Sequence, residues 1–501
     1  MWLSRKDRLL LMSVLAVLLL GDIYFHLWPV LMRRFGRDCG CSNTGEDPNS
    51  RQTSKLQHLF SHPLYQPQDP LNPALQDKLL DYQETTGRYN RLAHLNRKEE
   101  NDDAWNSSTH MTETTYNLSA PWLQFHLEIS REALYPRSSK TVEQLIDWMG
   151  NVPIFKADLT SDTKKLNGEC DCEKIVKPSG THLKLVLHFQ ELGKAMFKPM
   201  RQSREEETSE DFFYFVDLQR HNAEIAAFHL DRILDFRRVP PVAGRLMNVT
   251  SEILEVTPNE ELQDVFFVSP AHNVCFFARC PYSCKTEYAV CGNPHMLEGS
   301  LSAYLPPHFL AFRISVQNPW KRSYTFTGKE EWEVNPSYCE QLKQTEPYTN
   351  MKRLLNIMDL AIFDFLIGNM DRHHYDLFTK FADDGFLLHM DNARGFGRHS
   401  YDELTILAPI YQCCLVKEDT WLRLKLLSTP EYRLSDVMRE SLSRDRLQTV
   451  LTEPHLLALD RRLQTVLQVV EECVQKHGNG SVIIKESRRQ AVPTRVQQRA
   501  V

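Results

Sequence analysis

Three aspartates in the second half of the chain stand where they could act together on a phosphate group. Asp371 follows a predicted helix, Asp376 comes five residues later, and Asp391 follows a short apolar run. Phosphoryl transfer needs one carboxylate to orient the attacking hydroxyl and others to hold a divalent ion on the phosphates, because its catalysis is mostly positioning and charge neutralisation. The three acids fit these roles. Loop carboxylates that only cap turns are the alternative interpretation.

The same stretch offers a second alternative, a hydrolytic zinc site. Aspartate and histidine are common zinc ligands, and the stretch contains Asp371, His373, His374 and Asp391. Adjacent histidines rarely point to one ion, which disfavours this interpretation.

Two elements must position these aspartates. Apolar residues recur at helical spacing from 351 to 367, and Gly368 is a typical helix stop, so we predict a buried helix that ends shortly before Asp371. Residues 386–390 form a short apolar run that predicts a strand, which would deliver Asp391 into a turn. Two acidic loops would then flank one hairpin.

A lysine upstream could supply positive charge for phosphates. Residues 184–189 and 195–197 alternate around a Gly-containing turn, which predicts a β-hairpin whose second strand ends at Lys198. A compact ammonium group there could bind phosphates, and an ordinary solvated lysine is the alternative. The chain lacks a Gly-x-Gly-x-x-Gly loop, so the glycine loop of ordinary kinases is excluded.

The next segment predicts a helix over about residues 217–234, with Gln219 on the face that packs inward. Protein kinases place a glutamate at this point, where it pairs with the strand lysine. The amide of Gln219 has no charge to offer to Lys198 or to a metal. Glu224 lies five residues on, which turns its side chain by roughly 140° along an α-helix, so we do not expect it to take this place.

The composition and the N-terminus indicate the secretory pathway. Twelve cysteines accompany N-glycosylation sequons at Asn106, Asn117, Asn248 and Asn479, a combination typical of a lumenal protein. A basic N-terminus followed by an apolar stretch predicts a signal peptide or a signal anchor within residues 1–33. The net charge of -6 gives no argument for nucleic-acid binding.

Clustered cysteines in the first half could form disulfides or a zinc site. They are Cys170 and Cys172, followed by Cys275, Cys280, Cys284 and Cys291. The sequons and the leader favour disulfides, although spacing alone does not determine their connectivity. Cys39 and Cys41 could pair within one chain or between two.

Four motifs resemble the secretory-pathway kinase family that includes the Golgi casein kinase and the xylosyl kinase of proteoglycan synthesis. The motifs are GNMDRHHY at 368–375, HMDNARGFG at 389–397, RHNAEIAAFHL at 220–230 and QCC at 412–414. The similarity covers about residues 120–483. Gln219 and the Cys170-x-Cys172 pair make the chain resemble, in particular, a pseudokinase member of this family.

The resemblance implies an α+β, two-lobed protein-kinase-like fold that is stabilised by disulfides. The expected parts are a leader over residues 1–33, a disordered stalk or pro-segment over 34–117, a β-containing N-lobe with a cysteine-rich insertion over 118–300, a mainly helical C-lobe over 301–484, and a basic tail over 485–501. The polar composition of the stalk indicates disorder.

The resemblance also implies a role for each matching residue. The implied nucleotide-binding residues are Lys198 for the phosphates, Ser302, Ala303, Tyr304 and Leu305 for adenine, and Gln219, Asp376 and Asp391 around the metal position. Asp371 would be a vestigial catalytic base. Active members have glutamates where this chain has Gln219 and Asp376. Because a neutral amide is a poor ligand for a hard cation, ATP would still bind while metal-supported transfer would fail.

The family's cysteine pattern implies a set of disulfides. The implied pairs are Cys170–Cys280, Cys172–Cys284, Cys275–Cys291, Cys339–Cys413 and Cys414–Cys473. The first two would be specific to the pseudokinase member, and no structural metal is expected.

The expected function is that of an inactive kinase-like protein of the Golgi lumen, the endoplasmic reticulum and the extracellular space. The resemblance implies that it binds the Golgi casein kinase paralogue and raises that enzyme's phosphorylation of secreted matrix proteins in biomineralisation and enamel formation. A homodimer is a further option, and membrane contact is expected only through an N-terminal anchor. The alternatives are an active Ser/Thr kinase, with Glu224 replacing the missing ligand after a helix shift, and a glycan (xylose) kinase.

Overall fold

The computed structural model describes residues 54–66, 77–91, 117–159, 184–200, 202–209, 220–257, 259–277, 286, 289–323 and 328–486. The predicted leader, Gln219 and the tail beyond residue 486 lie outside these ranges, as do Cys39, Cys41, Cys170, Cys172, Cys280 and Cys284. Across the described ranges, no helix combines the length and the apolar character needed to cross a membrane.

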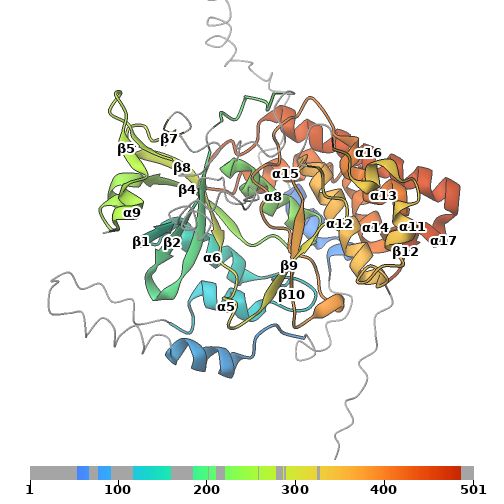
Figure 1. Ribbon diagram of the computed structural model, residues 1–501, viewed down its shortest axis with the longest axis horizontal. Coiled ribbons are helices and arrows are strands. Elements are labelled where there is room, and N and C mark those ends of the chain that lie inside the picture. Colours follow the sequence, from blue (N-terminus) through green and yellow to red (C-terminus); the bar gives the residue numbers. More distant parts are fainter. Residues whose placement is uncertain are drawn as a thin grey trace, which may run out of the picture. The chain divides into compact units, whose positions relative to one another are not determined.

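A five-stranded antiparallel sheet forms the core of the first half of the described chain (Figure 1). Its strands, in spatial order, are β1 (Ile154–Leu159), β2 (Leu185–Phe189), β3 (Lys194–Pro199), β8 (Met296–Ala303) and β4 (Val242–Asn248). Buried and more exposed positions alternate along β2, as expected for a strand with one face on the core. The predicted β2–β3 hairpin is confirmed, and Lys198 lies one residue before the end of β3.

Helix α8 (His221–Ile233) packs between this sheet and the helical half of the chain. Every residue of α8 except Arg232 is buried, because the sheet covers one side and later segments cover the other. The predicted start near residue 217 is wrong. Arg220 has an extended backbone, with φ −128° and ψ 126°, so the helix does not continue back through it.

A small second sheet is inserted between β4 and β8 in the sequence (Figure 1). It contains β5 (Phe266–Val268), β6 (Val274–Phe276) and β7 (Val290–Cys291), all antiparallel. Cys275 and Cys291 face each other across β6 and β7 and form a disulfide, which confirms this predicted pair.

The second half of the described chain is mainly helical and is built around α12 (Met351–Ile367). The sequence of α12 is apolar on nearly all sides, which is typical of an internal helix, and all but its first two residues are buried. The helix has the predicted bounds and ends at Gly368, whose φ of 70° places it in the left-handed conformation that glycine adopts without strain.

The other helices of this half are α10 (Glu331–Val334), α11 (Tyr338–Leu342), α13 (Ala408–Cys413), α14 (Glu418–Leu427), α15 (Leu434–Leu442), α16 (Glu453–His477) and α17 (Asn479–Val482). Among them, α13 and α16 pack against α12, and the rest pack mainly against other elements. Two further predicted disulfides are confirmed: Cys339–Cys413 joins α11 to α13, and Cys414–Cys473 joins the end of α13 to α16.

The remaining elements are short or lie in the first half. They are α5 (Pro121–Glu128), α6 (Lys140–Asn151), α9 (Glu260–Gln263), η2 (Pro63–Tyr65), η5 (Gln190–Leu192), η6 (Thr250–Leu254), η8 (Ala382–Asp384), η9 (Leu404–Leu407) and the parallel pair β11 (Val416–Lys417) and β12 (Ile483–Ile484).

The predicted strand over residues 386–390 is wrong. The strand of this region is β10 (His374–Phe378), which pairs with β9 (Arg313–Gln317) in an antiparallel ribbon. Residues 386–390 run beside β10 and share one isolated bridge, between Leu388 and Asp376. A buried apolar run without a full hydrogen-bonded partner therefore mimicked the sequence pattern of a strand.

The predicted disorder of residues 34–117 is also wrong for the parts that the structure describes. Residues 54–66, which we call the N-terminal strap, form helix α3 (Lys55–Ser61) and η2 and bury Leu56, Leu59 and Tyr65. Residues 82–91 are helical too. The polar composition concealed these few apolar residues, which the body of the protein covers.

Polar contacts fasten the N-terminal strap to the helical half. Lys55 pairs with Asp436 at 2.8 Å, and the carboxylate of Glu440 accepts hydrogen bonds from Ser54 and from the backbone N–H of Leu56. At its other end, the Tyr65 hydroxyl donates to the backbone oxygen of Ile233, the last residue of α8, at 2.6 Å. The strap therefore ties α8 to α15.

Replacing Tyr65 by Phe should lower the free energy of unfolding by about 1 to 2 kcal/mol, because a buried backbone oxygen would lose its hydrogen-bond donor. Urea-induced unfolding with the disulfides intact measures this change. Tyr82→Phe is the matched control, because Tyr82 is 51% exposed and its substitution should change the unfolding free energy little. Equal effects of the two substitutions would contradict a docked strap.

Candidate functional site

Lys198 and two acids form a charged cluster where the sheet meets the helical half. The Nζ atom of Lys198 lies 2.6 Å from Oε1 of Glu224 on α8 and 2.7 Å from Oδ1 of Asp391. Lys198 and Glu224 are buried, whereas half of the Asp391 side chain is exposed. The structure thus brings together two of the predicted nucleotide-binding residues, Lys198 and Asp391.

Glu224 is the glutamate that pairs with Lys198, although we did not expect this pairing from the sequence. The expectation assumed one continuous helix from Gln219 to Glu224, but α8 begins only at His221, so the angular offset along the helix does not apply. Gln219 lies outside the described residues. The next residue, Arg220, donates its backbone N–H to the oxygen of Ala393 at 2.9 Å, two residues beyond Asp391.

The ion pairs keep Lys198 charged. Burial alone would lower the pKa of Lys198, but the negative charges of Asp391 and Glu224 outweigh it and raise the pKa well above its ordinary value. The ammonium group is therefore protonated throughout the physiological range, as a phosphate-binding lysine must be.

Asp371, the predicted vestigial base, is engaged by basic neighbours. Its Oδ2 lies 2.5 Å from Nη1 of Arg394, and its Oδ1 lies 3.5 Å from Nδ1 of His373. Burial would lower the pKa of His373, but its hydrogen bond to Asp371 and the charge of that carboxylate raise it instead. The carboxylate that would accept a proton from a substrate hydroxyl is thus already paired on both oxygens.

Asp376 was expected in an acidic loop, but it lies in β10, opposite Ser315 of β9. Its Oδ1 is buried and forms no hydrogen bond among the described residues. Burial and the charge of His373 lower the pKa of His374. The nearby carboxylates of Asp376 and Asp391 raise this pKa, but by less. Asp376 therefore lies near enough to influence the same histidine as Asp391, but no ion pair links it to Lys198 among the described contacts.

The described residues contain no group of three or more His, Cys, Asp or Glu side chains arranged to hold a metal ion. In the stretch that suggested a zinc site, Asp371 pairs with Arg394 and His373, and Asp391 pairs with Lys198. The role of Asp376 as a metal ligand stays a prediction.

The predicted adenine-facing segment, Ser302 to Leu305, begins in β8 and continues beyond its end at Ala303. Tyr304 donates its N–H to the oxygen of Lys194 at 3.3 Å, and its own oxygen accepts a hydrogen bond from Nε2 of His126 at 2.8 Å. The N–H of Ala303 is bonded to the oxygen of Pro241. These contacts reduce the number of backbone groups that the segment can offer to adenine, and that role stays a prediction.

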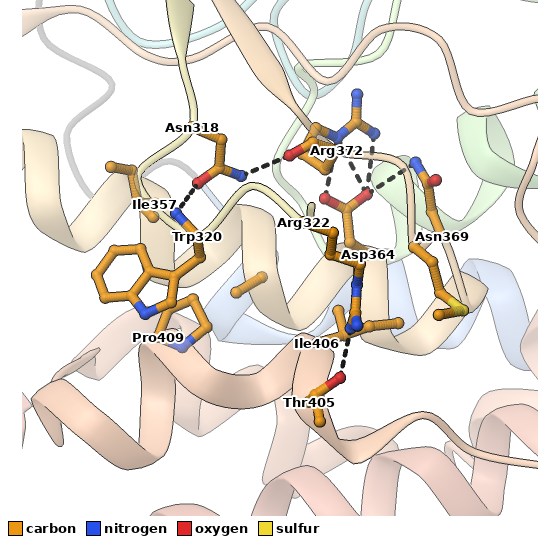
Figure 2. Close-up of a pocket in the computed structure, with 12 residues that line it drawn as sticks. Asn318, Trp320, Arg322, Ile357, Asp364, Asn369, Arg372, Thr405, Ile406 and Pro409 are labelled. Atoms are coloured by element: carbon orange, nitrogen blue, oxygen red, sulfur yellow. Dashed lines mark hydrogen bonds and ion pairs between the residues drawn. The ribbon is translucent and has the colours of Figure 1, made fainter. Parts of the chain in front are cut away.

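A salt bridge beneath the acidic loop connects it to α12 (Figure 2). Arg372 binds the buried carboxylate of Asp364 through Nε and Nη2, each at 2.9 Å, and also donates to the backbone oxygen of Met390. Asn318 donates to the backbone oxygen of Arg372 at 2.9 Å. The adjoining cavity of about 30 Å³ has room for one or two waters and does not admit a nucleotide.

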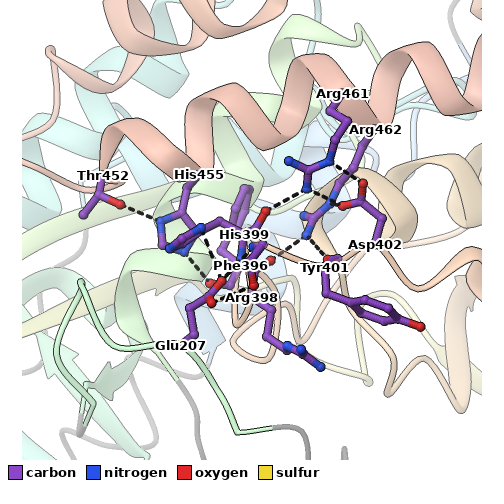
Figure 3. Close-up of polar contacts among 11 residues, drawn as sticks. Glu207, Phe396, Arg398, His399, Tyr401, Asp402, Thr452, His455, Arg461 and Arg462 are labelled. Carbon is purple, nitrogen blue, oxygen red and sulfur yellow. Dashed lines mark hydrogen bonds and ion pairs between the residues drawn. The ribbon is translucent and has the colours of Figure 1, made fainter.

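A second cluster holds the segment after Asp391 and was not foreseen (Figure 3). Glu207 accepts hydrogen bonds from the backbone N–H groups of His399 and Ser400 at 2.6 and 2.7 Å, and from the Ser400 hydroxyl at 2.7 Å. Burial would raise the pKa of Glu207, but these bonds lower it to about 2. Glu207 lies in a polar, unpatterned stretch, so no sequence signal marks it.

The same segment is held from the other side by α16 (Figure 3). Arg462 donates to the backbone oxygens of Leu366, Arg398 and Tyr401, at 3.0, 2.6 and 3.2 Å. Asp402 pairs with Arg461 and Arg462. The loop that follows Asp391 is therefore held in place by residues from both halves of the described chain.

The described sequons differ in accessibility. Asn117 and Asn479 are exposed, Asn248 is half-buried at the end of β4, and Asn106 lies outside the described residues. Glycosylation at these positions stays a prediction, as do the pairs Cys170–Cys280 and Cys172–Cys284.

Comparison with known proteins identifies a matching family. Residues 120–482 match the family model described as Golgi casein kinase, C-terminal, Fam20. The human protein named Pseudokinase FAM20A is 58% identical over 98% of this chain and 98% of its own length. The human Extracellular serine/threonine protein kinase FAM20C is 46% identical over 89% of this chain and 74% of its own length.

A solved structure is similar as well. The crystal structure of the Golgi casein kinase with Mn/ADP bound aligns with a TM-score of 0.66 at 31% identity, over 89% of this chain and 96% of that chain. This likeness, together with the described disulfides, confirms the predicted kinase-like α+β fold.

Buried histidines predict a loss of stability in acid. Burial lowers the pKa of His455 to about 4; its Nε2 donates to the oxygen of Phe396 and its Nδ1 accepts from Thr452. In the unfolded chain this ring takes up a proton near pH 6.5, whereas in the folded protein it stays neutral. The unfolded state therefore gains a proton between pH 6.5 and about 4, so stability falls as the pH falls through this window.

Replacing His455 by Asn should make the unfolding free energy less steep between pH 6.5 and 4, by up to about 1.4 kcal/mol per pH unit. Urea unfolding at several pH values measures the slope. His477→Asn is the control, because His477 is exposed at the end of α16. Identical slopes in wild type and His455→Asn would contradict a neutral, buried ring.

Proposed function

Because this chain belongs to the Fam20 family of Golgi casein kinase-like proteins, we propose that it is a secretory-pathway pseudokinase, which binds a nucleotide without transferring its phosphate. One observation carries the proposal. Glu224, the alternative carboxylate for the missing metal ligand, is buried and already bound to Lys198 at 2.6 Å and to the N–H of Asn392 at 3.1 Å. Both contacts use Oε1, so Glu224 replaces Gln219 as the partner of Lys198, and we propose that it does not also replace the missing metal ligand.

The residues of the charged cluster suit a nucleotide better than a divalent ion. Lys198 offers a protonated ammonium group for phosphates, and the half-exposed Asp391 lies beside it. A hard cation needs several oxygen ligands, of which negatively charged ones are the strongest. Gln219 is uncharged, and Lys198 neutralises part of the charge of both Glu224 and Asp391. Asp376 is one methylene shorter than the glutamate of active members, so the set of acids is a weak one for a divalent ion.

We further propose that the chain acts by binding the Golgi casein kinase paralogue and raising its activity toward secreted matrix proteins, in biomineralisation and enamel formation. The support is the family, with an extracellular serine/threonine protein kinase at 46% identity and a pseudokinase at 58%. An inactive copy can activate an enzyme when their shared interface favours the active conformation of the enzyme. The proposed location is the Golgi lumen, the endoplasmic reticulum and the extracellular space.

An active kinase is the second candidate, and a specific observation favours it. The lysine–glutamate ion pair that protein kinases require is complete, and Asp371 is in place on the acidic loop. The acceptor would be a protein serine or threonine, or a xylose-containing glycan.

Replacing Gln219 by Glu should make nucleotide binding depend on Mn²⁺, because the substitution adds a charged oxygen ligand. We expect wild-type protein to bind ATP equally well with and without Mn²⁺, and the variant to gain about tenfold in affinity when Mn²⁺ is present. Isothermal titration calorimetry measures both affinities. Robust transfer from labelled ATP to casein or to a xylose acceptor by wild-type protein, abolished by Asp371→Ala, would favour the active kinase instead.

Addition of this chain to the purified Golgi casein kinase should increase the rate of substrate phosphorylation, and the Asp371→Ala variant should activate equally well. Equal activation is expected because the proposed role needs binding and no phosphoryl transfer by this chain. Initial rates at several ratios of the two proteins measure the effect. Loss of activation in the Asp371→Ala variant, with its fold intact, would mean that this chain contributes catalysis.

A further inference from the structure

A continuous series of polar contacts runs from the sheet to the central helix. Lys198 pairs with Glu224, and the same oxygen of Glu224 accepts the backbone N–H of Asn392. The side chain of Asn392 accepts a hydrogen bond from Arg372, which is paired with Asp364 on α12. We infer that Asn392 is a positioning residue, which fixes the carboxylate of Glu224 against Lys198 and so stabilises their ion pair.

Every polar group of Asn392 that faces the interior has a partner. Its Oδ1 accepts from Nη2 of Arg372 at 2.7 Å, its Nδ2 donates to the backbone oxygen of His389 at 2.9 Å, and its N–H donates to Glu224 at 3.1 Å. The residue is completely buried. A donor and an acceptor on opposite sides of one amide permit a single orientation of the side chain, which anchors residue 392 where its backbone N–H meets Glu224.

The helix that carries Glu224 is held independently of Asn392. Nδ2 of Asn222 donates to the backbone oxygen of Val450 at 3.1 Å, and Nδ1 of His229 lies 2.7 Å from the hydroxyl of Ser441. These contacts fix the axis of α8, but neither reaches the end of the Glu224 side chain. The position of the carboxylate therefore depends on Lys198 and Asn392.

Protein kinases have a phenylalanine after the metal aspartate, and the packing of that ring distinguishes active from inactive states. A ring packed by apolar contact can leave its place at modest cost. Asn392 occupies the corresponding position in this chain and is bonded to both halves at once. Loss of this residue's contacts would leave buried polar groups without partners, which favours a single state.

The test is the chemical reactivity of Lys198 in the Asn392→Ala variant of the otherwise intact protein. An acid anhydride acylates neutral, accessible amines, so an ion-paired, buried lysine reacts slowly. Peptide mass spectrometry measures acylation of Lys198 relative to that of Lys194, an exposed lysine of the same strand. We expect the ratio to rise about tenfold in the variant, and also in Glu224→Gln, which removes the anion itself.

Asn356→Ala provides the matched control. Asn356 is also a buried asparagine, and it too accepts from an arginine, Arg238, and donates to a backbone oxygen, that of Gly385. It lies outside the series, so its substitution should destabilise the fold without changing the reactivity of Lys198. The inference is overturned if Asn392→Ala leaves the ratio unchanged, or if Asn356→Ala raises it equally.

Asn392→Ser replaces the alanine variant if the latter does not fold. A serine hydroxyl is too short to bridge Arg372 and the oxygen of His389, yet it keeps a polar group in the buried position. The same increase in the Lys198 ratio is expected. A ratio equal to that of wild type in a folded Asn392→Ser protein would assign the fixation of Glu224 to α8 alone and overturn the inference.

Discussion

The buried ion pair between Lys198 and Glu224 is the contact on which the arrangement of the charged cluster depends. It joins β3 of the sheet to α8, and Asp391 extends it to the segment that follows residues 386–390 in the helical half. Removing one member of a buried pair leaves an unpaired charge in the interior, at a cost of about 3 to 5 kcal/mol. The sheet, α8 and that segment therefore hold one another in a single arrangement.

Other polar contacts restrict movement between the two halves of the described chain. Besides the N-terminal strap, Glu207 reaches the loop at His399 and Ser400, and the N–H of Gly244 in β4 donates to Asp445. Kinases that turn over substrate must open and close their cleft. A molecule tied in this way is better suited to present a constant surface to a partner, which agrees with the proposed role as an activator.

The sequence predicted the long elements well and the charged cluster around Lys198 only in part. The apolar pattern of residues 351–367 was sufficient to predict α12, and the alternation around residues 190–193 was sufficient to predict the β2–β3 hairpin. Both patterns are local, because apolar residues recur at the spacing of the element itself. The pairing of Glu224 was missed because helical counting assumed that α8 starts four residues earlier than it does. No local pattern marks Glu207 or Asn392, whose partners are distant in the sequence and are chosen by the fold.

The docked strap has a consequence for the order in which the protein can be built. Its contacts join residues that are 381 to 386 positions apart, since Ser54, Lys55 and Leu56 meet Asp436 and Glu440. During synthesis the early segment leaves the ribosome long before its docking surface exists. Its apolar side chains must wait in solvent, or with a chaperone, until nearly the whole polypeptide has been translated. Completion of the fold is thereby deferred to the last stage of chain growth.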